Sequence, residues 1–191
     1  MEAFLTSTAI VALAEMGDKT QLLAIILATR FGKPLPIIAG IFVATIANHA
    51  LAALVGAQVA GLLQSHWFQI AVALGFIGMG VWTLIPDKMD DDEDGLAKSR
   101  GGVFLTTLIA FFLVEMGDKT QVATVALGAR YLDVPIVAAG TTIGMMIANV
   151  PAVFLGEVLA EKVPMVWLQR IAAGLFIILG GWQLAEALGW L

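Results

Sequence analysis

Two identical seven-residue segments contain most of the residues in this sequence that could do chemistry. Both read Glu-Met-Gly-Asp-Lys-Thr-Gln, at Glu15–Gln21 and again at Glu115–Gln121, one hundred residues later. Each segment lies in the middle of a long apolar stretch. A carboxylate at membrane depth is costly, so two identical carboxylate pairs at that depth indicate a function that requires them. Cation transport is the simplest such function.

The spacing of the acidic residues predicts a shared oxygen-rich site. Each segment places an aspartate three residues after a glutamate, which puts both carboxylates on one face of a continuous helix. We expect the two segments to meet and to surround one cation with carboxylate, hydroxyl and amide oxygens. The expected ligands are Glu15, Asp18, Glu115, Asp118, Thr20, Gln21, Thr120 and Gln121. Such a set suits hard divalent cations, above all Ca²⁺, Mg²⁺ and Mn²⁺.

Four further polar residues are candidates for supporting roles. Asn48 and Asn149 lie mid-span at nearly equivalent positions, and each would add a carbonyl ligand or, as an equally supported alternative, form an interhelical hydrogen bond. Lys19 and Lys119 follow the two glutamates by four residues, so we expect them to compensate charge in the ion-free site. A purely structural set of ion pairs is the competing interpretation, and the additional aspartate in each segment weighs against it.

Crowded carboxylates also predict coupling to protons. Four of them in one site cannot all stay ionised without a counter-charge, and they titrate as a coupled set. Protons and a divalent cation would then compete for the same oxygens. A site of this kind releases the metal where protons are plentiful and binds it where they are scarce, which is the basis of an antiporter.

The composition is that of an integral membrane protein. Of the 191 residues, 60% are hydrophobic and 13% are charged, against about a quarter charged in a typical soluble domain; the mean hydropathy is +0.93. The chain has no cysteine, which excludes disulfides and thiolate chemistry. Its two histidines, His49 and His66, lack ligand-like spacing, which argues against a zinc site. We interpret His49 as a packing residue, with proton relay as the less favoured alternative.

Apolar stretches of about 20 residues or more, enough to cross a bilayer, predict six transmembrane helices. They fall near residues 2–29, 35–63, 67–86, 102–129, 134–161 and 165–189. The halves match at an offset of one hundred beyond the motif, for example Gly40 with Gly140 and Trp82 with Trp182. Three spans per repeat is an odd number, so the second repeat must enter the membrane in the opposite sense, and such inverted repeats place a substrate site near the midplane.

We therefore expect an all-α membrane protein with two inverted three-helix repeats, residues 1–86 and 102–191, joined by an acidic cytoplasmic loop at 87–101. The connections on one side contain Arg30, Lys33, Lys88, Lys98, Arg100 and Lys162. The other side has only Arg130. The positive-inside rule puts the first group in the cytoplasm and both termini outside it. The run Asp90–Asp94 lacks the alternating ligands of an EF-hand, so we interpret it as a solvated linker.

The doubled Glu-x-Gly-Asp-Lys/Arg-Thr/Ser signature resembles that of a cation-transporter family. The family includes the Golgi manganese/calcium–proton antiporters of eukaryotes and small bacterial manganese exporters. The resemblance covers essentially the whole chain, with both motifs, six spans and an acidic central loop. It implies that Glu15, Asp18, Glu115 and Asp118 bind the transported ion, with the threonines and glutamines of the motifs close by. Since the chain begins without a long extension, we expect the bacterial cytoplasmic (inner) membrane.

The resulting hypothesis is a secondary transporter that exports Mn²⁺, with Ca²⁺ as an additional candidate substrate, from the cytoplasm in exchange for protons by alternating access. We expect no enzyme activity, no cofactor beyond the transported cation and no nucleic-acid partner. We expect contact with the lipid bilayer, and the sequence allows either a monomer or a homo-oligomer. The rival transporter is an exporter of a small organic cation or amino acid, because carboxylates also hold ammonium groups. From other classes come an intramembrane acid/base hydrolase and an assembly protein held together by ion pairs.

Overall fold

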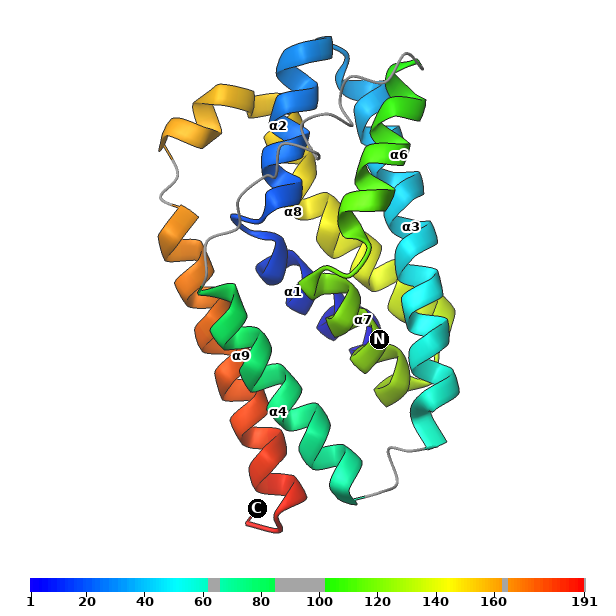
Figure 1. Cartoon of the computed structure of the whole chain (residues 1–191), viewed down its shortest axis with the longest axis vertical. Helices are drawn as coiled ribbons and strands as arrows, with labels where there is room; N and C mark the ends of the chain where they lie inside the picture. Colours follow the sequence, from blue (N-terminus) through cyan, green and yellow to red (C-terminus); the bar gives the residue numbers. More distant parts are fainter. Residues whose placement is uncertain (62–65, 85–101, 163–164, 191) are drawn as a thin grey trace.

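The computed structural model describes residues 1–61, 66–84, 102–162 and 165–190, and these residues form helices joined by short connections (Figure 1). We find no strand in these ranges. The predicted acidic loop at 87–101 lies outside the described residues. The helices are α1 (Glu2–Glu15), α2 (Lys19–Phe31), α3 (Pro34–Val59), α4 (His66–Thr83), α6 (Val103–Glu115), α7 (Lys119–Tyr131), α8 (Val134–Lys162) and α9 (Met165–Ala187).

The first apolar stretch of each half contains two helices, so the prediction of one unbroken helix in each stretch was wrong. The breaks fall inside the repeated motif. Gly17 and Gly117 both have φ +81°, a left-handed conformation that glycine adopts without steric cost. The next residues, Asp18 and Asp118, have extended backbone and are the N-caps of α2 and α7. The motif therefore ends one helix and starts the next.

Two of the described helices are long and apolar enough to cross a membrane by length and composition. They are α3 and the Val134–Leu155 part of α8, the second element of each half. Two shorter apolar helices, Ala73–Trp82 and Val103–Glu115, lie within α4 and α6. A helix rises 1.5 Å per residue, so the 26 residues of α3 span more than the hydrocarbon thickness of about 30 Å.

Polar residues share the interior with an apolar core, and many large apolar residues are exposed. Small polar residues lie inside the described part of the chain, among them Ser7, Thr45, Thr106, Thr107, Thr141 and Thr142, all buried. Many large apolar residues lie outside, and Leu51, Val55, Trp82, Phe154, Ile178 and Trp182 are each more than 40% exposed. Such an extensive apolar exterior matches contact with lipid rather than water.

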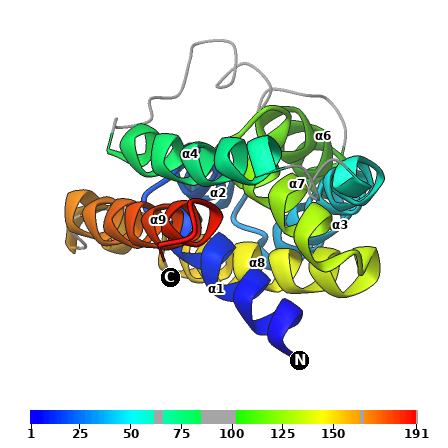
Figure 2. The same ribbon diagram turned by 90° about the horizontal axis from the view of Figure 1, so that it is seen from below.

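Each half packs its broken helix against the long helix of the other half. α1 and α2 lie against α8, while α6 and α7 lie against α3. The chain rises through α1 and α2 in Figure 1 and descends through α6 and α7. The third elements, α4 and α9, lie side by side at one flank, and α3 lies at the opposite one (Figures 1 and 2).

Contacts between the halves are reciprocal at the offset of one hundred residues. A Cβ atom placed on Gly40 would lie 2.7 Å from the Cβ of Thr107, and one placed on Gly140 would lie 2.9 Å from the Cβ of Ser7. The same exchange holds between α4 and α9, where Gly80 lies against Ile177 and Gly180 against Ile77. Small residues let these helices approach closely. Each half thus uses the same surface to contact the other.

The α4–α9 contact predicts different effects for two adjacent glycines. A Cβ on Gly180 would lie 2.7 Å from Ile77 Cγ1 and 2.9 Å from the Ala73 carbonyl oxygen, whereas one on Gly181 meets no atom within 4 Å. Gly180→Ala should lower the free energy of unfolding by about 1–3 kcal/mol, the usual cost of overpacking. Gly181→Ala is the matched control and should be neutral or slightly stabilising, because alanine favours helix. Thermal unfolding of the detergent-solubilised protein measures both; equal destabilisation would contradict the packing.

Candidate cation site

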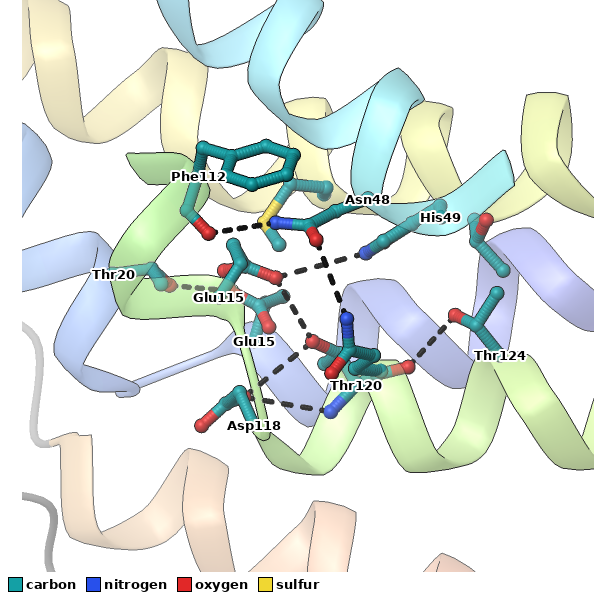
Figure 3. Close-up of polar contacts among 12 residues, drawn as sticks. Glu15, Thr20, Asn48, His49, Phe112, Glu115, Asp118, Thr120 and Thr124 are labelled. Carbon is teal, nitrogen blue, oxygen red and sulfur yellow. Dashed lines mark hydrogen bonds and ion pairs between the residues drawn. The ribbon is translucent and has the colours of Figure 1, made fainter. Parts of the chain in front are cut away.

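The two helix breaks meet in the interior, where Glu15, Glu115 and Asp118 lie near one another (Figure 3) and Asp18 joins Glu15 and Asp118 in one group. Glu15 and Glu115 are the last residues of α1 and α6, while Asp18 and Asp118 cap α2 and α7. All four side chains are buried, with at most 3% exposed. The site therefore sits where two helix C-termini, which favour positive charge, face two capped N-termini.

Three of the four carboxylates form one compact group. Glu15, Asp18 and Asp118 each offer a carboxylate oxygen, and these oxygens lie within 4.8 Å of one another. Oxygen ligands at about 2.1–2.5 Å from a cation lie up to about 5 Å apart across it, so the spacing fits one ion. The group takes residues from both halves, as the sequence predicts.

The fourth carboxylate lies beside this group and faces a histidine. One oxygen of Glu115, Oε2, is 3.7 Å from Nε2 of His49 and accepts a hydrogen bond from the Thr120 hydroxyl at 3.4 Å. The negative charges of Glu15, Asp18 and Asp118 all act on Glu115. The sequence predicts one site with four carboxylates; in the structure Glu15, Asp18 and Asp118 form the group, and Glu115 lies outside it.

The two lysines pair across the halves. Lys119 Nζ lies 2.6 Å from Asp18 Oδ1, and Lys19 Nζ lies 3.8 Å from Asp118 Oδ1. The sequence predicts that each lysine pairs with the glutamate four residues before it on one helix. The structure lacks that helical geometry, because α1 ends at Glu15 and α6 ends at Glu115. The two pairs are unequal: the side chain of Lys119 is 2% exposed and that of Lys19 is 21% exposed. Each of these two ion pairs therefore joins a lysine of one half to an aspartate of the other.

The threonines of the motifs hold the carboxylates. The Thr20 hydroxyl donates to Glu15 Oε2. The Thr120 hydroxyl donates to Glu115 Oε2 and to Asp118 Oδ2, each at 3.4 Å, and its backbone N–H also donates to Asp118 Oδ2. Both threonines are fully buried. They fix carboxylate orientation, and their oxygens lie beside the group where a cation would sit.

The glutamines brace the helix breaks. The side-chain oxygens of Gln21 and Gln121 accept hydrogen bonds from the N–H groups of Gly17 at 3.1 Å and Gly117 at 2.7 Å. Their amide nitrogens donate across the halves, Gln21 to the Ala148 carbonyl and Gln121 to the Asn48 side chain. Each glutamine thereby links the turn of its own motif to the long helix of the other half.

The two asparagines have different surroundings. Asn48 Nδ2 donates to the Phe112 carbonyl at 2.9 Å, and its Oδ1 accepts from Gln121; these are the interhelical hydrogen bonds of the alternative interpretation. Asn149 Nδ2 donates to the Met145 carbonyl within α8, while its buried Oδ1 has no hydrogen-bond partner among the described residues. An exact offset of one hundred matches Asn149 with His49, and this register is the sequence signal that points to His49.

The unequal lysine pairs predict unequal costs of removal. Lys119→Met leaves Asp18 buried without the cation at 2.6 Å, and breaking a buried ion pair costs about 3–5 kcal/mol. Lys19→Met should cost about 1 kcal/mol or less, because its pair is longer and partly exposed. Chemical denaturation of the purified, metal-free protein gives both values. The double variant Lys119→Met, Asp18→Asn should recover part of the loss, and equal losses for the two lysines would contradict the asymmetry.

Comparison of the whole chain with known proteins identifies a family and several relatives. The family model for the divalent cation/proton antiporter GDT1 matches residues 3–91 and 103–190. A Vibrio cholerae protein described as a candidate manganese exporter is 48% identical over 94% of this chain and 88% of its own length. GDT1-like protein 5 of Arabidopsis thaliana is 28% identical over 94% of both chains, and a GDT1-like protein of Synechocystis is 29% identical over 85% of this chain and 87% of its own. No solved structure gives a significant match.

Proposed function

Because the chain belongs to the GDT1 family of divalent cation/proton antiporters, we propose that it exports Mn²⁺ from the cytoplasm in exchange for protons, with Ca²⁺ as a second substrate. The observation on which this proposal rests is the convergence of Glu15, Asp18 and Asp118, three buried carboxylates from both halves, within 4.8 Å. The description of the Vibrio cholerae relative favours manganese among the divalent cations.

The ion pairs suggest how a cation enters the site. The ammonium of Lys119 stands 2.6 Å from Asp18 and supplies positive charge at the carboxylate group. A divalent cation that binds Glu15, Asp18 and Asp118 takes over that role, and Lys119 withdraws. Protons neutralise the same oxygens when the cation leaves, because an empty group of buried carboxylates is otherwise strongly repulsive. Metal and protons therefore occupy the site in turn.

The reciprocal packing suggests how access alternates. We propose that the described helices belong to a six-span protein with two inverted repeats, each counting its broken helix as one span. The site lies at the seam between the halves, where α1 and α2 meet α8 and where α6 and α7 meet α3. Rocking one half against the other would then open the seam first to one side and then to the other.

Reconstitution tests transport and its coupling. The purified protein in liposomes should take up radioactive Mn²⁺ when an outward proton gradient is imposed, and collapsing that gradient with a protonophore should reduce the rate to that of gradient-free vesicles. Protons and metal exchange through one site, so the metal flux follows the proton gradient. Mn²⁺ flux that is indifferent to the gradient would refute proton exchange, and absence of flux in every condition would refute transport.

Site variants test which residues bind the cation. Glu15→Gln, Asp18→Asn, Glu115→Gln and Asp118→Asn should each lower the Mn²⁺ flux at least about tenfold, since even residues that only orient a metal ligand cost about 10–100-fold. Glu186→Gln is the matched control, because Glu186 is an exposed carboxylate on α9. Lys19→Arg should lose less than any of the four. A site variant that transports like the control would remove that residue from the site.

One observation favours a second candidate. Because the Lys119 ammonium already lies against Asp18, the same carboxylates suit a small organic ammonium ion. Such a substrate would inhibit Mn²⁺ flux competitively and would itself be transported. Counterflow with labelled amines or basic amino acids separates the candidates, and the manganese assignment fails if an amine is moved while Mn²⁺ is not.

Repeat-related positions predict membrane orientation. Lys33 and Asp133 precede α3 and α8 at equivalent places, so inverted repeats put them on opposite sides, with Lys33 in the cytoplasm. The chain has no cysteine, so Lys33→Cys and Asp133→Cys each create a single thiol. A membrane-impermeant maleimide should label the residue-133 variant in intact cells and the residue-33 variant in inside-out vesicles. Labelling of both variants from one side would contradict the inverted topology.

A further inference from the structure

His49 and Glu115 face each other in the interior at ion-pair distance but without a hydrogen bond between them. The His49 side chain is fully buried in α3, and its Nε2 lies 3.7 Å from Glu115 Oε2 (Figure 3). That distance is too long for a hydrogen bond. Neither ring nitrogen of His49 has a hydrogen-bond partner among the described residues, and Glu115 Oε1 has none either. Buried polar atoms are normally satisfied, so this gap marks a place for something else.

The separation fits two ligands of one metal ion. Metal–nitrogen and metal–oxygen bonds of about 2.0–2.2 Å put adjacent ligands about 3 Å apart and opposite ligands about 4.3 Å apart. The 3.7 Å between the imidazole nitrogen and the carboxylate oxygen lies inside that interval. An ion there would also stand next to the three-carboxylate group, because the Thr120 hydroxyl lies 3.4 Å from both Glu115 Oε2 and Asp118 Oδ2.

We propose that His49 is the residue that sets metal selectivity, by adding an imidazole nitrogen to an otherwise all-oxygen site. This inference rests on the proposed function and names the class of cation that the site prefers: first-row transition-metal ions such as Mn²⁺ over Ca²⁺ and Mg²⁺. Calcium and magnesium take oxygen ligands, whereas imidazole is a ligand for transition metals. Replacing one oxygen by one nitrogen penalises Ca²⁺ and Mg²⁺ more than it penalises Mn²⁺.

The duplication provides the comparison within the chain. The position related to His49 by the offset of one hundred is Asn149, also fully buried, whose Oδ1 has no hydrogen-bond partner among the described residues. One half thus presents a nitrogen donor where the other presents an amide oxygen. His49→Asn gives the first half the residue that the second half already has, and it makes the site all-oxygen.

The first test measures selectivity. In proteoliposomes of the full chain, the ratio of Mn²⁺ flux to Ca²⁺ flux should fall about tenfold in His49→Asn and in His49→Gln, because one ligand favouring Mn²⁺ is lost. Ca²⁺ flux should be retained, which shows that the variants are folded. His66→Gln, which removes the other histidine, should keep the wild-type ratio. An unchanged ratio in the His49 variants would overturn the proposal while leaving Mn²⁺ export standing.

The second test detects the nitrogen directly and does not depend on transport. Pulsed electron paramagnetic resonance of Mn²⁺ bound to the purified protein should show coupling to nitrogen, and labelling only histidine with ¹⁵N should change that coupling. The signal should persist in His66→Gln and disappear in His49→Asn. Bound Mn²⁺ without histidine coupling would overturn the proposal, whereas coupling in a protein that moves no Mn²⁺ would overturn only the proposed function.

Discussion

The exchange of counter-charges between the two halves is the interaction on which the rest of the structure depends. Asp18 and Asp118 are buried, and a buried carboxylate without a cation costs several kcal/mol. Each aspartate finds its lysine in the other half, Lys119 at 2.6 Å and Lys19 at 3.8 Å. The two lysine–aspartate ion pairs described here therefore join the halves at the motifs. Interlocking of the halves, including the packing of each broken helix on the opposite long helix, accompanies these pairs.

The helix breaks are a second consequence of the same motif. A continuous helix would point Glu15 and Asp18 along one face but would keep their backbone groups bonded within the helix. The left-handed Gly17 instead ends α1, and Gln21 satisfies the N–H group that the break would otherwise leave open. Four helix ends thus meet at the carboxylates, and their partial charges contribute to a cation site without further buried charge.

Much of this could be predicted from the sequence because the signals are local or duplicated. The repeated heptapeptide identified the acidic residues, and three of the four do converge. The break was missed because hydropathy ignores backbone conformation, although Gly-Asp inside an apolar run combines a helix stop with an N-cap. The ion pairs of Lys19 and Lys119 with aspartates of the opposite half were not predicted, because residue spacing within a segment says nothing about contacts between distant segments. His49 was not predicted to lie beside the carboxylates, because Asn149 was paired with Asn48. That pairing is one residue away from the offset of one hundred set by the motifs.

The two halves are not identical in sequence, and their differences bear on the relative free energies of the two access states of the proposed transporter. With identical halves, the outward-facing and inward-facing states would be related by a two-fold rotation about an axis in the membrane plane and would have equal free energies. Here His49 replaces the asparagine found at position 149, and the lysine pairs differ in length and exposure. In the proposed transporter, these differences would make the free energies of the two states unequal, and they would bias which side the site faces and how tightly each side holds metal. They cannot set the direction of net transport, because a passive exchanger only couples two gradients. Direction therefore depends on the cell, and selectivity depends on the chain.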